Sequence, residues 1–219
     1  MRSRNNGVTG PPDRTFRVIL AGDASVGKSS IMMRLIKGTF VDNLPSTLGV
    51  DFHVKLMNVD GQNVAIQLWD TAGQERFRSL SKSYFRRADG ALLIYDCTSE
   101  QSFINVRSWM DTIQESTPRS IPICVIGNKI DIRVSATASG KRCVKADEGM
   151  KLAKSYNALF HETSAKEGAY IEELAMEIVR ELLANEDSEI SSSSLVLRST
   201  SQQGRLTPGR CAGGQRKCT

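Results

Sequence analysis

The octapeptide 22–29, GDASVGKS, is the feature that most constrains the fold of this chain. It matches the pattern G-x-x-x-x-G-K-[ST], and it lies between an apolar run at 16–21 and a helix-compatible stretch at 28–37. Backbone N–H groups at such a junction of strand and helix can converge on an anion. The sequence therefore predicts a strand, a loop that binds phosphate groups and a helix, in that order.

Each residue type in this loop has a physical reason. Gly22 and Gly27 allow a close approach of the backbone that a Cβ atom would obstruct. Lys28 brings a positive charge to the terminal phosphates, and the Ser29 hydroxyl can be a ligand of Mg²⁺. The other candidate phosphate contacts are Asp23, Ala24, Ser25, Val26 and Ser30. A glycine-rich turn that binds no ligand is the alternative interpretation.

The composition favours one globular domain with tails. The chain has 219 residues, of which 40% are hydrophobic, and this is enough for one sizeable core. No window of about 18 apolar residues occurs and the N-terminus is polar, so we expect neither a membrane-spanning helix nor a secretory signal. The cysteines include no CxxC pair, so disulfides and zinc are not expected either. These features predict a cytoplasmic protein.

The chain is basic, with a net charge of +5 and an isoelectric point near 9.0. Its basic residues are dispersed, and no run interleaves them with aromatic residues, which argues against nucleic acid as a partner. An anionic nucleotide and a membrane surface are the simpler explanation of the charge.

Apolar runs alternate with amphipathic stretches from Phe16 onward. Only residues 60–62 separate the second strand from the third, so this pair is predicted to be an antiparallel hairpin. The other strands are separated by helices and should run parallel with right-handed crossovers. The predicted strands are 16–21, 50–59, 63–69, 90–96, 121–127 and 158–162. The predicted helices are 28–37, 79–86, 100–116, 146–156 and 169–184.

The runs at 91–95 and 121–126 are apolar throughout, as in strands that are covered on both faces. The predicted fold is therefore α/β with three layers, in which five helices flank a six-stranded, mostly parallel sheet with one antiparallel strand. From about Asn185 the composition shifts to serine, glycine and arginine. The predicted organisation is a disordered segment at 1–14, a folded domain at 15–185 and a flexible tail at 186–219.

A second motif, WDTAGQE at 69–75, follows the second strand of the hairpin. Asp70 at the carboxyl end of that strand can hold Mg²⁺ through water. Gly73 leaves its N–H able to reach a γ-phosphate, and Gln74 can orient a water molecule because it has both a donor and an acceptor. An Asp70 that only caps a turn is the alternative interpretation.

A third motif, NKID at 128–131, directly follows an apolar strand. The Asp131 carboxylate can accept two hydrogen bonds from the adjacent N–H and NH₂ groups of guanine, a pair that adenine lacks. Ser164, Ala165 and Lys166, after the last strand, would supply backbone N–H groups to the guanine carbonyl oxygen. Because such a site rejects an analogue without these groups, the motif predicts GTP rather than ATP.

Five strings carry a resemblance to a known family: GDASVGKS, STLGVDF, LWDTAGQERF, GNKID and ETSAK, in this order. Over about residues 15–185 they resemble the Rab branch of the Ras-like small GTPases. The resemblance implies a monomeric molecular switch that alternates between GTP and GDP, hydrolyses GTP slowly and uses Mg²⁺. It also implies effectors, an exchange factor and a GTPase-activating protein as partners, and a role in vesicle traffic on the cytosolic face of an intracellular membrane.

The resemblance also assigns roles to single residues. Thr47 corresponds to the threonine whose hydroxyl joins Mg²⁺ and whose N–H holds the γ-phosphate, and Phe40 to the aromatic beside guanine. Phe52, Trp69 and Tyr84 correspond to the aromatics that bind effectors, although aromatics on a hairpin can equally be core residues under a loop.

Catalysis in this family consists of positioning and charge stabilisation, with no protein nucleophile. By resemblance, Lys28 and Mg²⁺ neutralise the developing charge, Gln74 aligns the attacking water and Thr47 holds the γ-phosphate. Asn128 and Lys129 complete the guanine-binding motif with Asp131.

A finer resemblance concerns the segment 132–143, IRVSATASGKRC, which is longer than its counterpart in typical Rab proteins. Together with PDRTFRVILAGDASVGKSS and KSYFRRADG, it is similar to the GTPase module of Ras and EF-hand domain-containing proteins. No D-x-[DN]-x-[DN]-G loop and no heptad run occur before Phe16. The chain is then either a short form or a free-standing relative, and calcium regulation is not transferred to it.

Two features depart from the family pattern. Ala24 occupies a loop position that is usually glycine or serine, beside the place where Gln74 and an arginine finger would meet, and its methyl group can slow hydrolysis. The segment 216–219, RKCT, has the single cysteine Cys218, with Cys211 upstream, where Rab proteins typically end in paired cysteines. Prenylation of Cys218 is one interpretation, and an unmodified tail is the other.

Two further function classes stay open. A GTP-binding scaffold with little or no hydrolysis would result if Ala24 blocks turnover, although the presence of Gln74 argues against it. A P-loop kinase or ATPase is disfavoured because the motifs at 128–131 and 164–166 are suited to guanine.

Overall fold

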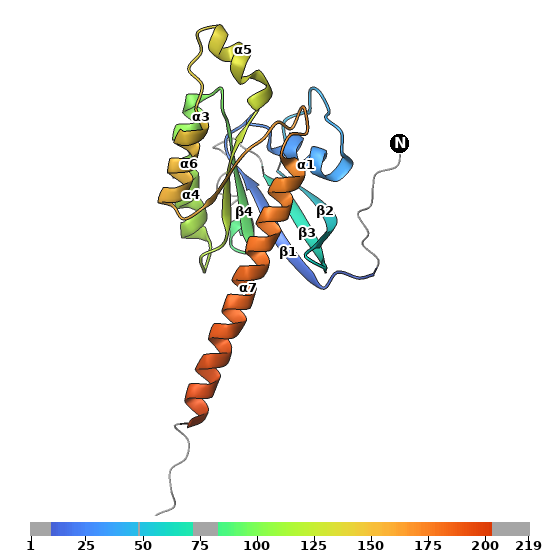
Figure 1. Ribbon diagram of the computed structural model, residues 1–219, viewed down its shortest axis with the longest axis vertical. Helices are drawn as coiled ribbons and strands as arrows, with labels where there is room; N and C mark the ends of the chain where they lie inside the picture. Colours follow the sequence, from blue (N-terminus) through green and yellow to red (C-terminus); the bar gives the residue numbers. More distant parts are fainter. Residues whose placement is uncertain (1–9, 48, 72–82, 203–219) are drawn as a thin grey trace, which may run out of the picture. The chain divides into compact units, whose positions relative to one another are not determined.

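The computed structural model describes residues 10–47, 49–71 and 83–202, with side chains as far as residue 190. Its centre is a six-stranded sheet with the strand order β2-β3-β1-β4-β5-β6 (Figure 1). The strands are β1 (Arg14–Ala21), β2 (Val50–Val59), β3 (Gln62–Thr71), β4 (Gly90–Asp96), β5 (Ile123–Asn128) and β6 (Leu159–Glu162). The six predicted strands are confirmed, with small shifts at their ends.

The strand β2 is the antiparallel member of the sheet. It pairs with β3 so that Phe52 lies opposite Trp69, whereas β1, β4, β5 and β6 all pair in parallel. The hairpin turns at Asp60 and Gly61, which both have positive φ, 51° and 87°. Two such residues give the turn a twist that matches the twist of the flanking strands. The predicted hairpin and parallel crossovers are therefore confirmed.

The helical elements are α1 (Lys28–Lys37), α3 (Glu100–Ile104), α4 (Val106–Ser116), a 3₁₀ turn η2 (Ile130–Ile132), α5 (Arg133–Ala138), α6 (Ala146–Ser155) and α7 (Ile171–Gln202). The helix predicted at 100–116 is in fact two helices that meet at Asn105. The side-chain amide of Asn105 donates a hydrogen bond of 2.7 Å to Asp23, which ties this junction to the loop after β1. Of the helix predicted at 79–86, residues 83–85 are described and are helical.

Helix α5 adds to the five helices that the sequence predicted. It buries no residue, so its sequence, RVSATA, carries no apolar period that could reveal it. Hydroxyl groups stabilise it locally, since Ser135 Oγ donates to Ile132 O and Thr137 Oγ1 donates to Arg133 O. The segment 132–143 therefore contains a short helix.

The last helix is longer than predicted. The chain divides into two units, residues 1–183 and 184–219, and the helix expected to end at residue 184 continues in the second unit to Gln202. The serine-rich composition of 186–202 predicted a flexible tail, but serine weakens a helix only slightly, and neither glycine nor proline occurs in this stretch. None of the helices in the described part of the chain is both long enough and apolar enough to cross a bilayer.

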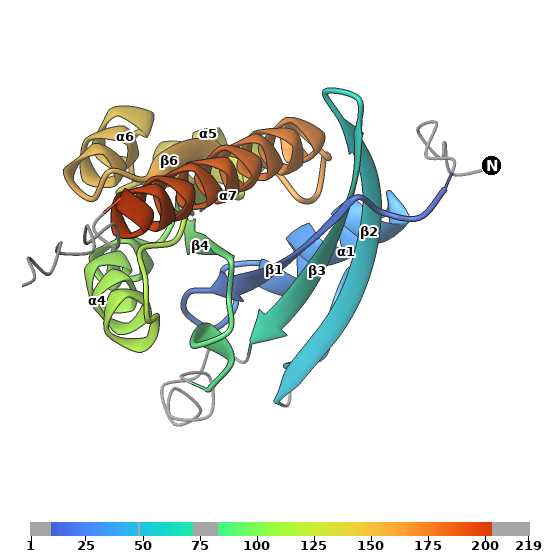
Figure 2. The same cartoon turned by 90° about the horizontal axis from the view of Figure 1, so that it is seen from below.

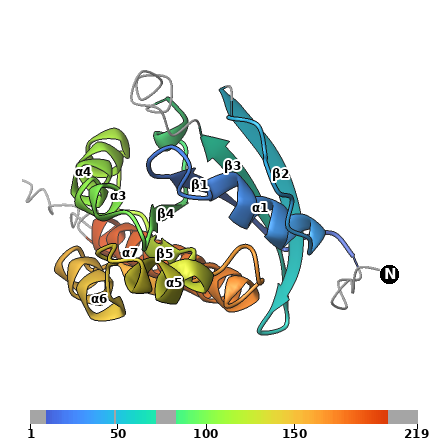
Figure 3. The ribbon, with the colours of Figure 1, turned by 90° about the horizontal axis from the view of Figure 1, so that it is seen from above.

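Buried side chains cover both faces of the sheet. On one face Leu20 of β1 belongs to a cluster with Ile31 of α1 and Ile178 of α7. On the other face Trp109 of α4 and Leu152 of α6 belong to a second cluster with β4 and β5. Figures 2 and 3 show these helices from the two ends of the sheet. The predicted three-layer α/β architecture is therefore confirmed.

We expect Gly149→Ala to lower the free energy of unfolding by about 1–3 kcal/mol, the usual cost of overpacking. A Cβ atom at Gly149 in α6 would overlap the ring of Phe160 and the hydroxyl of Tyr95. Urea denaturation followed by circular dichroism measures the change. Met150→Ala, at an exposed position of the same helix, is the control. Equal stability of the Gly149 variant and the wild type would contradict this packing.

Candidate functional site

A cavity of about 530 Å³ opens among the loops that follow the carboxyl ends of β1 and β5. The loop before α1, the segment from Phe40 to Thr47, the turn after β5 and the loop after β6 line it. Most of the residues predicted to contact a nucleotide line this cavity. They are Ala24, Ser25, Gly27, Lys28, Ser29, Ser30, Phe40, Thr47, Asn128, Lys129, Asp131, Ala165 and Lys166.

Three predicted contacts, Asp23, Val26 and Ser164, do not line the cavity. Gly73 and Gln74 lie outside the described residues, so their predicted roles stay predictions. The sequence also missed part of the lining, which consists of Val41, Asp42, Asn43, Leu44, Pro45, Ser46 and Ile132. Residues 41–45 lie between Phe40 and Thr47 but belong to no motif, and the motifs that contain Ser46 and Ile132 gave these two residues no role.

The loop before α1 has the backbone geometry that the glycine positions predicted. Gly22 and Gly27 have φ of 133° and 100°, which side chains with a Cβ rarely adopt. A Cβ at Gly22 would overlap the carbonyl oxygen of Ile94, and one at Gly27 would overlap the amide of Asn128. Glycine at these positions therefore allows the loop to lie directly against β4 and β5.

The Lys28 side chain is buried beneath this loop, with 5% of its surface exposed. Its Nζ donates to the carbonyl oxygens of Gly22 and Asp23 at 3.0 and 2.7 Å. Burial lowers the pKa of Lys28 to about 8, although the carboxylates of Asp70 and Asp23 oppose this shift. Among the described residues no carboxylate is bonded to this buried ammonium, which is therefore well placed to attract an anionic ligand.

Asp23 supports the loop rather than lining the cavity. Its carboxylate accepts hydrogen bonds from Asn105 Nδ2 at 2.7 Å and from Trp109 Nε1 at 2.9 Å. These donors lie at the junction of α3 and α4 and on α4. The Asp23 side chain thus anchors the loop to the helix layer, and the predicted contact of Asp23 with phosphate stays a prediction.

The three residues predicted to hold Mg²⁺ converge on one point. Ser29 Oγ donates to Asp70 Oδ2 at 2.5 Å, Thr47 Oγ1 donates to the same oxygen at 3.1 Å, and the two hydroxyls are 3.0 Å apart. Asp70 is 1% exposed, and its Oδ1 has no hydrogen-bond partner among the described residues. Burial raises the pKa of Asp70. Oxygen donors with an unsatisfied buried carboxylate oxygen fit the ligand preference of Mg²⁺.

At the other end of the cavity, the Asn128 side chain joins two loops. Its Nδ2 donates to Val26 O at 2.9 Å, and its Oδ1 accepts from Thr163 Oγ1 and from the Ala165 N–H, both at 3.2 Å. The nearby Lys129 ammonium pairs with a carboxylate oxygen of Asp96 at 2.8 Å. Asn128 is therefore a structural link between the phosphate loop and the loop after β6.

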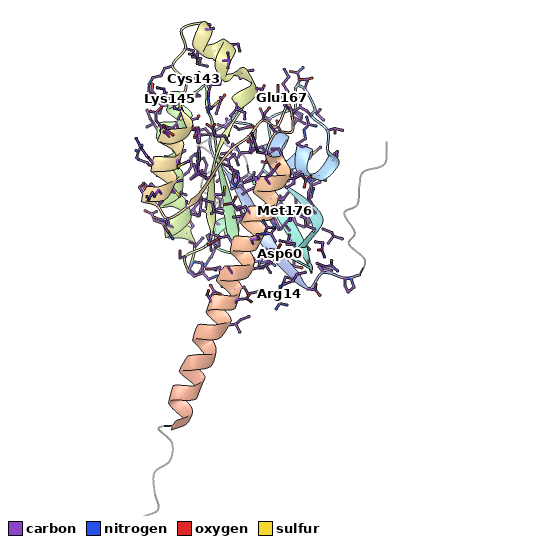
Figure 4. The ribbon with its side chains drawn as sticks, viewed as in Figure 1. Arg14, Asp60, Cys143, Lys145, Glu167 and Met176 are labelled. Atoms are coloured by element: carbon purple, nitrogen blue, oxygen red, sulfur yellow. The ribbon has the colours of Figure 1, made fainter. Side chains whose placement is uncertain are left out.

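The Asp131 carboxylate is oriented by the same loop. Ser164 Oγ donates to Asp131 Oδ1 at 2.7 Å and accepts from the Glu167 N–H at 3.0 Å. Glu167 is labelled in Figure 4, in the turn between β6 and α7. The Ser164 hydroxyl thus positions Asp131, and the predicted contribution of Ser164 to guanine binding stays a prediction.

The aromatic residues predicted to bind effectors form one cluster on β2, β3 and the segment after it. The ring centroids of Phe52 and Trp69 are 4.8 Å apart, and those of Trp69 and Tyr84 are 5.5 Å apart. Phe52 is 43% exposed and Tyr84 is 36% exposed. Of the two interpretations of this trio, the geometry favours a surface cluster over core residues beneath a loop.

Helix α5 is anchored next to the base end of the cavity. Its first residue, Arg133, donates through two guanidinium nitrogens to the carboxylate of Glu162 at the end of β6. Ile132, which precedes this arginine, lines the cavity. The segment 132–143 therefore contributes to the wall of the site, which its sequence alone did not indicate.

A family model described as the Ras family matches residues 17–184 of the chain. The Ras and EF-hand domain-containing protein homolog of Caenorhabditis elegans is 58% identical over 192 residues, which are 88% of this chain and 30% of that protein. The GTP-binding protein yptV2 of Volvox carteri is 38% identical over 208 residues, 94% of each chain. The Ras-related protein Rab-1D of Dictyostelium discoideum is 39% identical over 170 residues, 78% of this chain and 80% of that protein. The chain spans about a third of the length of its Ras and EF-hand domain-containing relatives.

We expect nucleotide affinity to fall as the pH rises above about 8, because Lys28 then loses its charge. A bound phosphate favours the ammonium form and raises its pKa in the complex, so the attraction is complete below pH 8 and is lost as the pH rises toward the pKa of the complex. The expected loss is at most about tenfold per pH unit. Dissociation constants measured from about pH 7 to about pH 9 test this. The Lys28→Met variant should lack this dependence, and an equal dependence in both proteins would contradict the assignment.

Proposed function

This chain belongs to the Ras family, and from that premise we propose that it is a molecular switch that binds GTP and GDP with Mg²⁺ and hydrolyses GTP slowly. The main support for the proposal is that a single cavity has cation-binding oxygen atoms at one end and a carboxylate suited to guanine at the other. Ser29, Thr47 and Asp70 converge at one end, and Asp131 lies at the turn after β5. A phosphate chain with its cation matches the first set, and the edge of a guanine base matches the second.

The proposed chemistry uses positioning and charge. Bound Mg²⁺ would neutralise charge that develops on the phosphate oxygens, with Ser29 and Thr47 as ligands and Asp70 holding it through water. Lys28, already buried under the loop, provides a second positive charge. Gln74 orients the attacking water, by the resemblance of its motif.

The proposed cellular role is the control of vesicle traffic through effectors that bind the GTP state. Two observations support it: the exposed aromatic cluster of Phe52, Trp69 and Tyr84, and the similarity over most of both chains to a Rab-1 protein. Aromatic side chains that are exposed together are typical of protein-binding surfaces. An exchange factor and a GTPase-activating protein would complete the cycle.

We also propose that the active protein is monomeric and peripheral on the cytosolic face of an intracellular membrane. Cys218 and Cys211 lie outside the described residues, and prenylation of Cys218 is proposed from the sequence alone. A single lipid chain gives marginal anchoring, so the nearby basic residues Arg210, Arg216 and Lys217 would assist by attraction to anionic lipids.

Competition between GTP and ATP tests the nucleotide assignment. We expect the wild type to prefer GTP strongly, and Asp131→Asn to weaken GTP binding by roughly 100-fold or more, because the acceptor loses its charge and one of its two oxygens becomes an NH₂ group that faces a donor of the base. The exposed residue Asp111 provides the matched control, Asp111→Asn, which should bind as the wild type does. Equal affinity of the wild type for the two nucleotides would refute the guanine assignment.

Phosphate release from bound GTP in a single turnover tests the hydrolysis assignment. We expect an intrinsic rate of the order of 10⁻³ s⁻¹ or lower, a further decrease in Gln74→Leu, and no change in Gln114→Leu, a control on the surface of α4. Ala24→Gly should increase the rate if the methyl group obstructs the attacking water. An absence of phosphate release in the wild type, together with tight GTP binding, would favour the scaffold alternative.

A further inference from the structure

The side chain of Arg34, in the last turn of α1, bonds both the residue that ends this helix and the loop after β6. Its Nε donates to Ala165 O at 2.8 Å, its Nη2 donates to Lys166 O, and its Nη1 donates to Gly38 O at 2.9 Å. Only the bond to Gly38 belongs to the usual interaction of a basic residue with a helix C-terminus. The other two bonds reach the loop after β6, which lies 131 and 132 residues further along the chain.

These bonds fix the orientation of a peptide group that faces the cavity. In a trans peptide the C=O and the following N–H point in opposite directions, and the described part of the chain has no cis peptide. Because Ala165 O points at Arg34, the Lys166 N–H points away from it. Ala165 and Lys166 both line the cavity. The guanidinium on α1 therefore determines which way this N–H is directed.

In the loop after β6, the neighbouring backbone N–H groups are already bonded within the protein, whereas the Lys166 N–H can still donate to a ligand. The Ser164 N–H donates to Ala169 O, the Ala165 N–H donates to Asn128 Oδ1, and the Glu167 N–H donates to Ser164 Oγ. In the described part of the chain, the Lys166 N–H has no hydrogen-bond partner. Lys166 is exposed and lines the cavity, so its N–H is open to an acceptor that a ligand supplies.

We propose that Arg34 is a positioning residue for base recognition: it holds the Ala165–Lys166 peptide so that the Lys166 N–H donates to the 6-oxo group of guanine. The inference rests on the proposed function, since it takes a guanine nucleotide as the ligand. Arg34 does not line the cavity and touches no ligand group itself. It acts through the two carbonyl groups that it holds, and through Gly38 it also fixes the start of the segment that leads to Thr47.

The test compares GDP with 6-thio-GDP, in which sulfur, a weaker acceptor, replaces the 6-oxo oxygen while the N–H and NH₂ groups that face Asp131 are kept. We expect the wild type to prefer GDP by between about twofold and tenfold, the value of one hydrogen bond. Arg34→Met, which keeps the length of the side chain and removes its donors, should bring this ratio close to one. Lys37→Met, at an exposed position of the same helix turn, should keep the wild-type ratio.

A second comparison separates positioning from general loosening of the site. IDP lacks the 2-amino group and keeps the 6-oxo group, so the ratio of GDP to IDP affinity reports on Asp131 and should change by less than about twofold in Arg34→Met. If Arg34→Met weakens all three nucleotides equally and both ratios persist, the inference is wrong. It is also wrong if the wild type does not distinguish GDP from 6-thio-GDP.

Arg34→Lys provides the same comparison should Arg34→Met fail to fold. Lysine keeps the charge and the aliphatic stem but cannot bond three carbonyl groups in the planar arrangement of a guanidinium, so the ratio of GDP to 6-thio-GDP should fall here too. An unchanged ratio in this variant would overturn the inference. A wild-type chain that binds no GDP at all would overturn the proposed function itself, and this result is distinct from a loss of discrimination.

Discussion

The buried amide of Asn128 is the interaction on which the rest of the site depends. It bonds Val26 in the phosphate loop and both Thr163 and Ala165 after β6, so a single side chain on β5 fixes two segments that are distant from it in sequence. A buried amide left without partners costs about 1–3 kcal/mol, and each segment is therefore held in the register that satisfies it. The absence of a Cβ at Gly27 makes this approach sterically feasible. The spacing between the phosphate end and the base end of the cavity follows from this link.

Two buried charges make the site incomplete without its ligands. Burial lowers the pKa of Lys28 and raises the pKa of Asp70, so in both cases the folded protein disfavours the charged form. For stability alone, apolar residues would serve as well or better at such positions. An anionic phosphate chain stabilises the ammonium, and a divalent cation stabilises the carboxylate. Ligand binding therefore offsets the electrostatic cost of burying these two charged groups. It should also stabilise the native state by mass action.

The sequence predicted the features that depend on local patterns, such as strands and glycine turns. It missed the side-chain contacts that form only when distant segments come together in the fold. The strands and the loop before α1 follow from apolar runs and glycine positions, and both are found as predicted. The sequence did not indicate the side-chain contacts of Asp23 and Ser164, because their partners, such as Trp109 and Asp131, lie far away in the sequence. Helix α5 has no buried face, so no apolar period could reveal it. Arg34 belongs to no motif, and only the fold brings it to the base loop.

The segment from Phe40 to Thr47 is the part of the cavity wall on which the proposed switch would act. Among the described residues, its hydrogen bonds are those of the Thr47 hydroxyl, with Ser29 and Asp70. No helix or strand holds the segment, although it forms much of one cavity wall. Phe40 packs against the core, and at the other end of the segment the Thr47 hydroxyl bonds the oxygen atoms of Ser29 and Asp70, whereas the base end of the cavity is held by Asn128 and by the loop after β6. In the proposed function, a ligand that differs only at its terminal phosphate would act on this less constrained wall, and β2, which begins at Val50, would carry the change toward the surface.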